Sequence, residues 1–181
     1  MSQVELVMTG YSIIVALCLA RLLDALRPAA VAGARYWVHY AWVIIKIMNI
    51  LVLYWATWAF LDQNLTFALF ILILAPPSIV YLQCDALLSK SPDDVESWYD
   101  HFYDNRRFFF FANAALAPVI MAQLALTGGA GVPTPVYALL ALLAVVSLAG
   151  ALIANPRVQS VIAVLALLNI TAGFTAQLTA L

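Results

Sequence analysis

Long apolar stretches dominate the chain, and short polar segments separate each stretch from the next. Six stretches hold about 20 or more mostly apolar residues, enough at about 1.5 Å per residue to cross a hydrocarbon layer about 30 Å thick. We therefore expect an all-α membrane protein in which residues 1–181 form a single bundle. Its spans should lie near residues 5–26, 37–60, 65–88, 107–127, 134–154 and 157–181.

The polar separators carry residues that end one helix and start the next. Asn155 precedes Pro156, so it can cap a helix that Pro156 opens. Thr134 and Pro135 give the fifth stretch the same kind of start. Residues 62–64, Asp-Gln-Asn, form a short polar turn between the second and third stretches. These signals support six separate helices.

The longest separator has a helical pattern of its own, near residues 92–105. Ser91 is a suitable N-cap, and Pro92 is a suitable first residue of a helix. The pattern predicts an amphipathic helix in the cytoplasmic interface, leading into the fourth span. Its acidic face fits two interpretations, a solvated surface and a docking site for a basic partner. That face comprises Asp93, Glu96, Asp100 and Asp104, while Trp98, Phe102 and Phe109 lie on another face.

Composition agrees with a lipid environment. The chain is 66% hydrophobic and 9% charged, whereas a soluble domain carries about a quarter of charged residues. A net charge of −1 provides no basic field for nucleic acid. The partners to expect are therefore the bilayer itself and either a second copy of the chain or another membrane subunit.

The distribution of basic residues predicts an orientation. Short loops rich in Lys and Arg stay in the cytoplasm. The first-to-second, third-to-fourth and fifth-to-sixth connections are therefore expected to be cytoplasmic, with both termini on the opposite side. Their basic residues are Arg27, Arg35, Lys90, Arg106, Arg107 and Arg157.

The second stretch contains an internal lysine, Lys46, in the segment AWVIIKIMNILVLYW. In a span over 37–60 it lies about 3 or 4 Å from the membrane midplane, too deep for its side chain to reach the headgroups. Facing lipid, it would cost on the order of 3 kcal/mol. His39, Trp42 and Asn49 share its helical face. We predict that this polar stripe faces protein or water, in a structural, ligand-contacting or proton-handling role.

Three further charged residues complete a candidate intramembrane polar site with His39, Lys46 and Asn49. Arg21 and Asp24 are three residues apart in the first span, close enough to pair. Asp85 stands near the end of the third span, where it is a candidate partner for either Arg21 or Lys46.

Prolines interrupt two spans near the middle of the membrane. Pro76 and Pro77 lie in the third span and Pro118 in the fourth. Each removes one backbone hydrogen bond and bends its helix. We list all three as candidate helix breaks, either as packed kinks or as parts of a binding site.

The familiar signatures of catalysis and cofactor binding are missing from the sequence. There is no Gly-rich phosphate loop, zinc-type His/Cys set or serine-nucleophile elbow. The two histidines, His39 and His101, fall in different segments and do not suggest a ligand pair. Cys18 and Cys84 fall inside apolar stretches and are interpreted as small core residues. We predict no catalytic residue, metal or cofactor, and an enzyme is not the favoured interpretation.

Three motifs in the first 110 or so residues carry a resemblance: RYWVHYAWV at 35–43, YWATW at 54–58 and RRFFFF at 106–111. In them the chain resembles a family of small polytopic bacterial inner-membrane proteins with no assigned activity. The resemblance implies a bacterial inner membrane, so both termini would be periplasmic. Lys46 stands where an apolar residue is expected in that family, so the resemblance does not make it a family-wide site.

Three functions fit these observations. The first is a small channel or transporter-like protein, in which His39, Lys46 and Asn49 line a cationic cavity open to the cytoplasm. The second is an accessory or scaffolding subunit of a larger membrane complex, held by lateral helix packing. The third is a lipid-acting intramembrane enzyme or lipid sensor that pairs Lys46 with Asp24 or Asp85.

Overall fold

The computed structural model describes residues 3–29, 36–60, 65–88, 95–127 and 134–179. Within these ranges every regular element is a helix, and six helices are long and apolar enough to cross a membrane. The predicted fold class, an all-α bundle of membrane-spanning helices, is therefore confirmed. The helices are α1 (Gln3–Ala29), α2 (Trp37–Ala56), α3 (Phe67–Leu87), α4 (Trp98–Leu126), α5 (Thr134–Leu152) and α6 (Pro156–Thr179), and the 3-10 turn η1 (Thr57–Phe60) extends α2.

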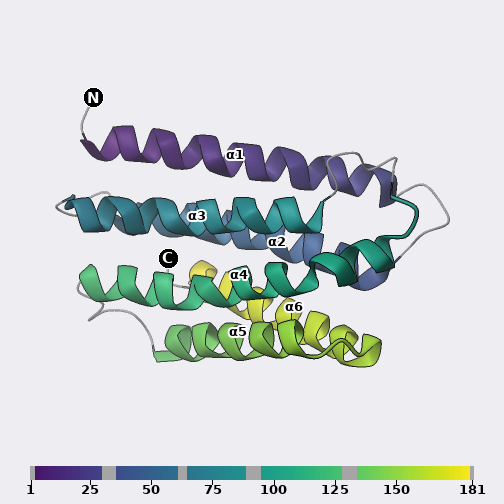
Figure 1. Ribbon diagram of the computed structural model, residues 1–181. Coiled ribbons are helices and arrows are strands. Elements are labelled where there is room, and N and C mark those ends of the chain that lie inside the picture. The colour runs from purple at the N-terminus through teal and green to yellow at the C-terminus, as the bar shows by residue number, and fades with distance from the viewer. Residues whose placement is uncertain (1–2, 30–35, 61–64, 89–94, 128–133, 180–181) are drawn as a thin grey trace.

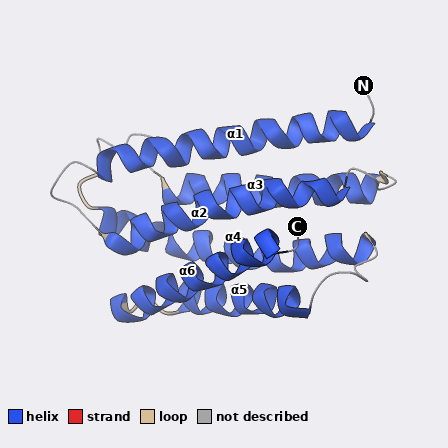
Figure 2. Ribbon diagram, turned by 180° about the vertical axis from the view of Figure 1, so that it is seen from behind, coloured by secondary structure: helices blue, strands red, loops and turns tan. Residues whose placement is uncertain are grey.

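The helices lie along a common direction in one bundle. Figures 1 and 2 show α1 along one edge and α5 along the opposite edge. The closest packing joins α4 to α3 on one side and to α5 on the other. Helix α1 packs against α3 and α2, and helix α6 packs against α2 and α5. The central helices α2, α3 and α4 therefore have neighbours on several sides, which places their inward residues far from lipid.

The surface and the core of the bundle are both apolar. Large aromatic and aliphatic side chains such as Trp42, Phe109 and Phe110 fill the core. Leu17, Val145 and many similar residues are more than half exposed on the outside. An outer surface of this kind suits hydrocarbon rather than water. The chain is a multi-pass integral membrane protein.

The basic helix ends gather at one end of the bundle. Figure 1 shows the ends of α1, α3 and α5 and the starts of α2, α4 and α6 at the right, opposite the start of α1. Arg106 and Arg107 lie in the first turns of α4, and Arg157 opens α6. The basic residues therefore lie at one end of the bundle, as the predicted orientation requires. Which side of the membrane this end faces stays a prediction.

The acidic segment before the fourth span differs in detail from the prediction. Ser97, not Ser91, is the N-cap of α4, and its Oγ accepts a hydrogen bond from the backbone N–H of Asp100 at 3.3 Å. The expected amphipathic helix is thus the beginning of α4 itself, from Trp98 onward, and Asp93 lies outside the described residues. Its aromatic face is covered by protein rather than lipid, since Trp98 and Phe102 are buried. Its carboxylates Glu96, Asp100 and Asp104 are exposed.

The prolines lie within continuous helices. Pro76 and Pro77 are inside α3, and Pro118 is inside α4. Because proline has no N–H, Pro76 leaves the carbonyl of Leu72 without its usual helical donor. Gln123 of α4 replaces that donor, since its Nε2 donates to the Leu72 carbonyl at 2.6 Å. The Gln123 side chain of α4 therefore replaces the backbone hydrogen bond that Pro76 removes from α3.

One glycine sets the distance between α4 and α5. A Cβ on Gly150 would lie 2.6 Å from the ring of Phe110, closer than real Cβ contacts allow. Phe110 is fully buried at this crossing. The absence of a side chain at Gly150 therefore lets the aromatic ring of α4 sit directly against the backbone of α5.

Candidate functional site: the buried lysine network

Lys46 is enclosed by protein. Its side chain is 1% exposed, and its neighbours on the same face of α2, His39 and Trp42, are each 1% exposed. Asn49, one turn further on, is half-buried. The polar stripe identified in the sequence therefore faces the interior of the bundle. The open cytoplasmic cavity expected around His39, Lys46 and Asn49 is not present among the described residues, because the helices close over Lys46 and His39.

The ammonium group of Lys46 meets an amide. Its Nζ donates a hydrogen bond to Oδ1 of Asn113 in α4. The same Nζ lies 5.4 Å from the ring centre of Phe109, one turn earlier on α4. That arrangement is a cation–π contact, favourable where water is excluded. Within the described ranges Lys46 forms no ion pair with a carboxylate.

Asn113 of α4 connects side chains from three other helices. Its Oδ1 also accepts from Nε2 of Gln83 in α3 at 3.4 Å, and its Nδ2 donates to Oγ of Ser147 in α5 at 2.7 Å. Ser147 in turn donates to the carbonyl of Leu143 at 2.5 Å. All four polar side chains are at most 1% exposed. We call Lys46, Gln83, Asn113 and Ser147 the lysine network.

The lysine network holds one basic side chain, Lys46, among neutral groups. Taking an ammonium out of water costs several kcal/mol, and an opposite charge normally offsets that cost. For Lys46 the Asn113 amide oxygen and the Phe109 ring stand in the position of an opposite charge. In addition, Oε1 of Gln83 is buried without a partner among the described residues. The site is therefore polar, enclosed and short of negative charge.

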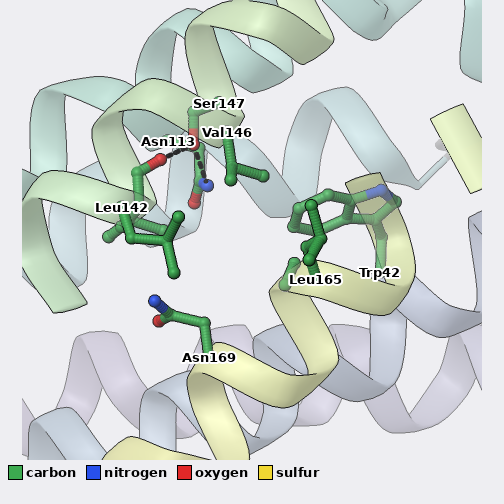
Figure 3. Close-up of a pocket in the computed structure, with 9 residues that line it drawn as sticks. Trp42, Asn113, Leu142, Val146, Ser147, Leu165 and Asn169 are labelled. Atoms are coloured by element: carbon green, nitrogen blue, oxygen red, sulfur yellow. Dashed lines mark hydrogen bonds between the residues drawn. The ribbon is translucent and has the colours of Figure 1, made fainter. Parts of the chain in front are cut away.

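A small pocket adjoins the lysine network. It has a volume of about 10 Å³ and lies where α2, α4, α5 and α6 meet, which is room for about one water molecule. Figure 3 shows Asn113 and Ser147 on one side of it and Asn169 on the other. Leu142 and Leu165, which also line it, are each 40% exposed. The pocket is therefore close to the outer surface of α5 and α6.

The other charged candidates lie apart from the lysine network. Arg21 donates to Asp85 at 3.1 Å across α1 and α3. Asp24 is exposed and forms no ion pair with Arg21 in the described part of the chain. The structure therefore assigns Asp85 to Arg21 rather than to Lys46. The Arg21 and Asp85 side chains are 27% and 49% exposed, so this pair lies at the surface of the bundle and not in its core.

Sequence reasoning identified some of these residues and missed others. Lys46 stood out because a charge inside an apolar stretch is rare. Gln83 and Ser147 carried no such signal, because single amide and hydroxyl side chains are common in membrane helices. Their role depends on which helices pack against one another. Hydrophobic patterning shows which face of a helix is buried, but it does not show which other helix covers that face.

Among the described residues no group of three or more His, Cys, Asp and Glu side chains is arranged to hold a metal ion. Comparisons with protein-family models, curated proteins and solved structures return no match. The function of the protein is therefore inferred from the geometry of its own chain, and the resemblance of the chain to bacterial inner-membrane proteins stays a prediction.

Proposed function

We propose that this protein is a small transporter or channel-like protein for a small anion, and that the described conformation is its closed form. The observation that supports the proposal is the environment of Lys46. Its ammonium group is buried beside Asn113 and Phe109 with no carboxylate paired to it in the described chain. Ionisable residues inside membrane proteins are rare, and substrate and ion pathways are among the sites they mark.

An anion at this position would supply the missing charge. Coulomb attraction between unit charges about 4 Å apart is roughly 4 kcal/mol at an effective dielectric constant of 20, several times its value in water. The amide groups of Gln83 and Asn113 each have a second N–H beyond the one used in the lysine network, and such groups donate the hydrogen bonds that a small anion needs on leaving water. The pocket beside them is small, which favours a halide or a short carboxylate over a lipid headgroup.

The path to the site runs between α5 and α6 in this proposal. The pocket touches Asn113 and Ser147 on its inner side and is lined by the exposed Leu142 and Leu165 on its outer side. A modest separation of these helices would connect the lysine network to the surface. Transport then requires alternation between this closed form and an open one.

The test is anion flux in proteoliposomes that contain the purified protein. Chloride and formate movement is followed for the wild type and for Lys46→Met, which keeps the side-chain length and removes the charge. We expect Lys46→Met to lower flux at least tenfold and Lys46→Arg to retain part of it. Arg157→Gln is the matched control, since Arg157 is an exposed cation at the start of α6.

Two outcomes would contradict the proposal. Vesicles with wild-type protein that are as tight to both anions as empty vesicles would remove a transport role. Equal flux in the wild type and Lys46→Met would remove Lys46 from the pathway. The first outcome would leave the accessory-subunit hypothesis, in which the exposed carboxylates Glu96, Asp100 and Asp104 contact a basic partner.

A further inference from the structure

Two histidines lie together at the end of the bundle where α2 and α4 begin. The ring centres of His39 and His101 are 6.5 Å apart, with an angle of 77° between the ring planes. The sequence placed them in different segments and gave no reason to pair them. The packing of α4 against the start of α2 brings them side by side with their rings nearly perpendicular, and neither belongs to the lysine network.

The imidazole nitrogens of this pair are buried without partners. Both nitrogens of His39 and Nε2 of His101 make no hydrogen bond to any described residue. The His39 side chain is 1% exposed, so water has little access to it. Leaving such a group unsatisfied costs about 1–3 kcal/mol. Three neighbouring imidazole nitrogens, two of His39 and one of His101, are therefore buried without a hydrogen-bond partner among the described residues.

The distance between the rings fits one bridging metal ion. A metal–nitrogen bond to imidazole is about 2 Å, and the nitrogen lies roughly 1 Å from the ring centre. Two imidazoles on opposite sides of one ion therefore have ring centres about 6 Å apart. The observed 6.5 Å is close to this separation.

Trp98 limits what can lie between the two rings. Its indole ring centre is 4.6 Å from that of His39 and 5.5 Å from that of His101. A planar macrocycle such as haem would need the space that this indole fills. A single cation would instead gain from the π face of Trp98.

We propose that His39 and His101 bind one copper(I) ion beside Trp98. Neutral imidazole is a good ligand for copper and zinc. Zinc prefers four ligands, whereas no group of three or more His, Cys, Asp and Glu side chains among the described residues is arranged to hold a metal ion. Copper(I) is a d10 ion that accepts two ligands in a near-linear arrangement, which suits two imidazoles with ring centres 6.5 Å apart. The half-buried His101 leaves a route to it from the end of the bundle.

The test is a copper(I) titration of the purified full chain under ascorbate, in competition with bicinchoninate. We expect one ion per chain in the wild type, and an affinity at least tenfold lower in His39→Phe and in His101→Phe. Phenylalanine keeps the ring and removes the nitrogens. The matched control is the double variant Cys18→Ser with Cys84→Ser, because these buried free thiols are the competing soft ligands. It should bind as the wild type does.

X-ray absorption of the copper-loaded wild type gives a second measurement that needs no variant. Nitrogen-only coordination supports the proposal, and sulfur scattering contradicts it. Copper binding lost in the serine variant but kept in the phenylalanine variants would assign the ion to the thiols. A wild type that binds no copper(I), or binds zinc(II) more tightly, would also overturn the proposal.

Discussion

Lys46 brings an ammonium group into the centre of the bundle, where its partner is the Asn113 amide. A buried charge of this kind is a poor way to stabilise a helix bundle. Replacing buried charges by apolar residues of similar volume is often neutral or stabilising by about 1–4 kcal/mol, whereas removing the partner of a buried charge costs about 3–5 kcal/mol. The two members of this hydrogen bond should therefore differ in their effect on stability.

We predict that Lys46→Met keeps or raises the thermal unfolding temperature in detergent, because Oδ1 of Asn113 still accepts from Gln83. Asn113→Leu should destabilise the protein by about 3 kcal/mol, because it leaves the ammonium group with the Phe109 ring alone. Thermal melts of both variants beside the wild type measure the difference. Equal destabilisation by the two substitutions would instead identify Lys46 as a structural residue.

At the scale of the helix, α3 and α4 depend on one another through a side chain. Pro76 removes the donor for the Leu72 carbonyl of α3, and Gln123 of α4 supplies a donor at 2.6 Å. In a membrane interior no water is available to donate a hydrogen bond to an unpaired carbonyl, so the missing bond costs free energy. Pro76 of α3 and Gln123 of α4 therefore form a structural pair across the helix interface.

A double-mutant cycle tests this pairing. Gln123→Leu should cost about 1–3 kcal/mol of stability, because it leaves the Leu72 carbonyl buried and unpaired. In the background of Pro76→Ala, which restores a backbone N–H to that carbonyl, the same substitution should cost clearly less. Denaturation of the four proteins in detergent gives the coupling. Additive effects would show that Gln123 and Pro76 act independently.

The helix positions were largely predictable, and the contacts between helices were not. Apolar length placed five of the six spans close to their observed ends, because a lipid core demands a minimum length. The start of α4 was misplaced because its polar composition resembles a surface helix, while Trp98 and Phe102 are in fact covered by protein. The lysine network, the Gln123 contact and the histidine pair depend on the rotation and depth of facing helices. A single sequence does not encode these quantities as a local pattern.

At the scale of the molecule, charge and packing together predict an orientation. The starts of α2, α4 and α6 share one end of the bundle (Figure 1). Arg106 and Arg107 lie in the third turn of α4, and Arg157 lies in the first turn of α6. Basic residues in short connections are retained in the cytoplasm. The candidate copper site also lies at this end, since His39 and His101 are in the first turns of α2 and α4. On this orientation copper would enter from the cytoplasm.

Cysteine accessibility in intact bacterial cells tests the orientation. In a background with Cys18 and Cys84 replaced by serine, we expect Arg157→Cys to react with a membrane-impermeant maleimide only after the cells are permeabilised. Pro135→Cys, an exposed position at the start of α5 and hence at the opposite end, should react in intact cells. The two positions serve as controls for each other, because both side chains are exposed and differ in the end they occupy. The reverse labelling pattern would invert the bundle, put both termini in the cytoplasm, and expose the His39–His101 pair to the periplasm.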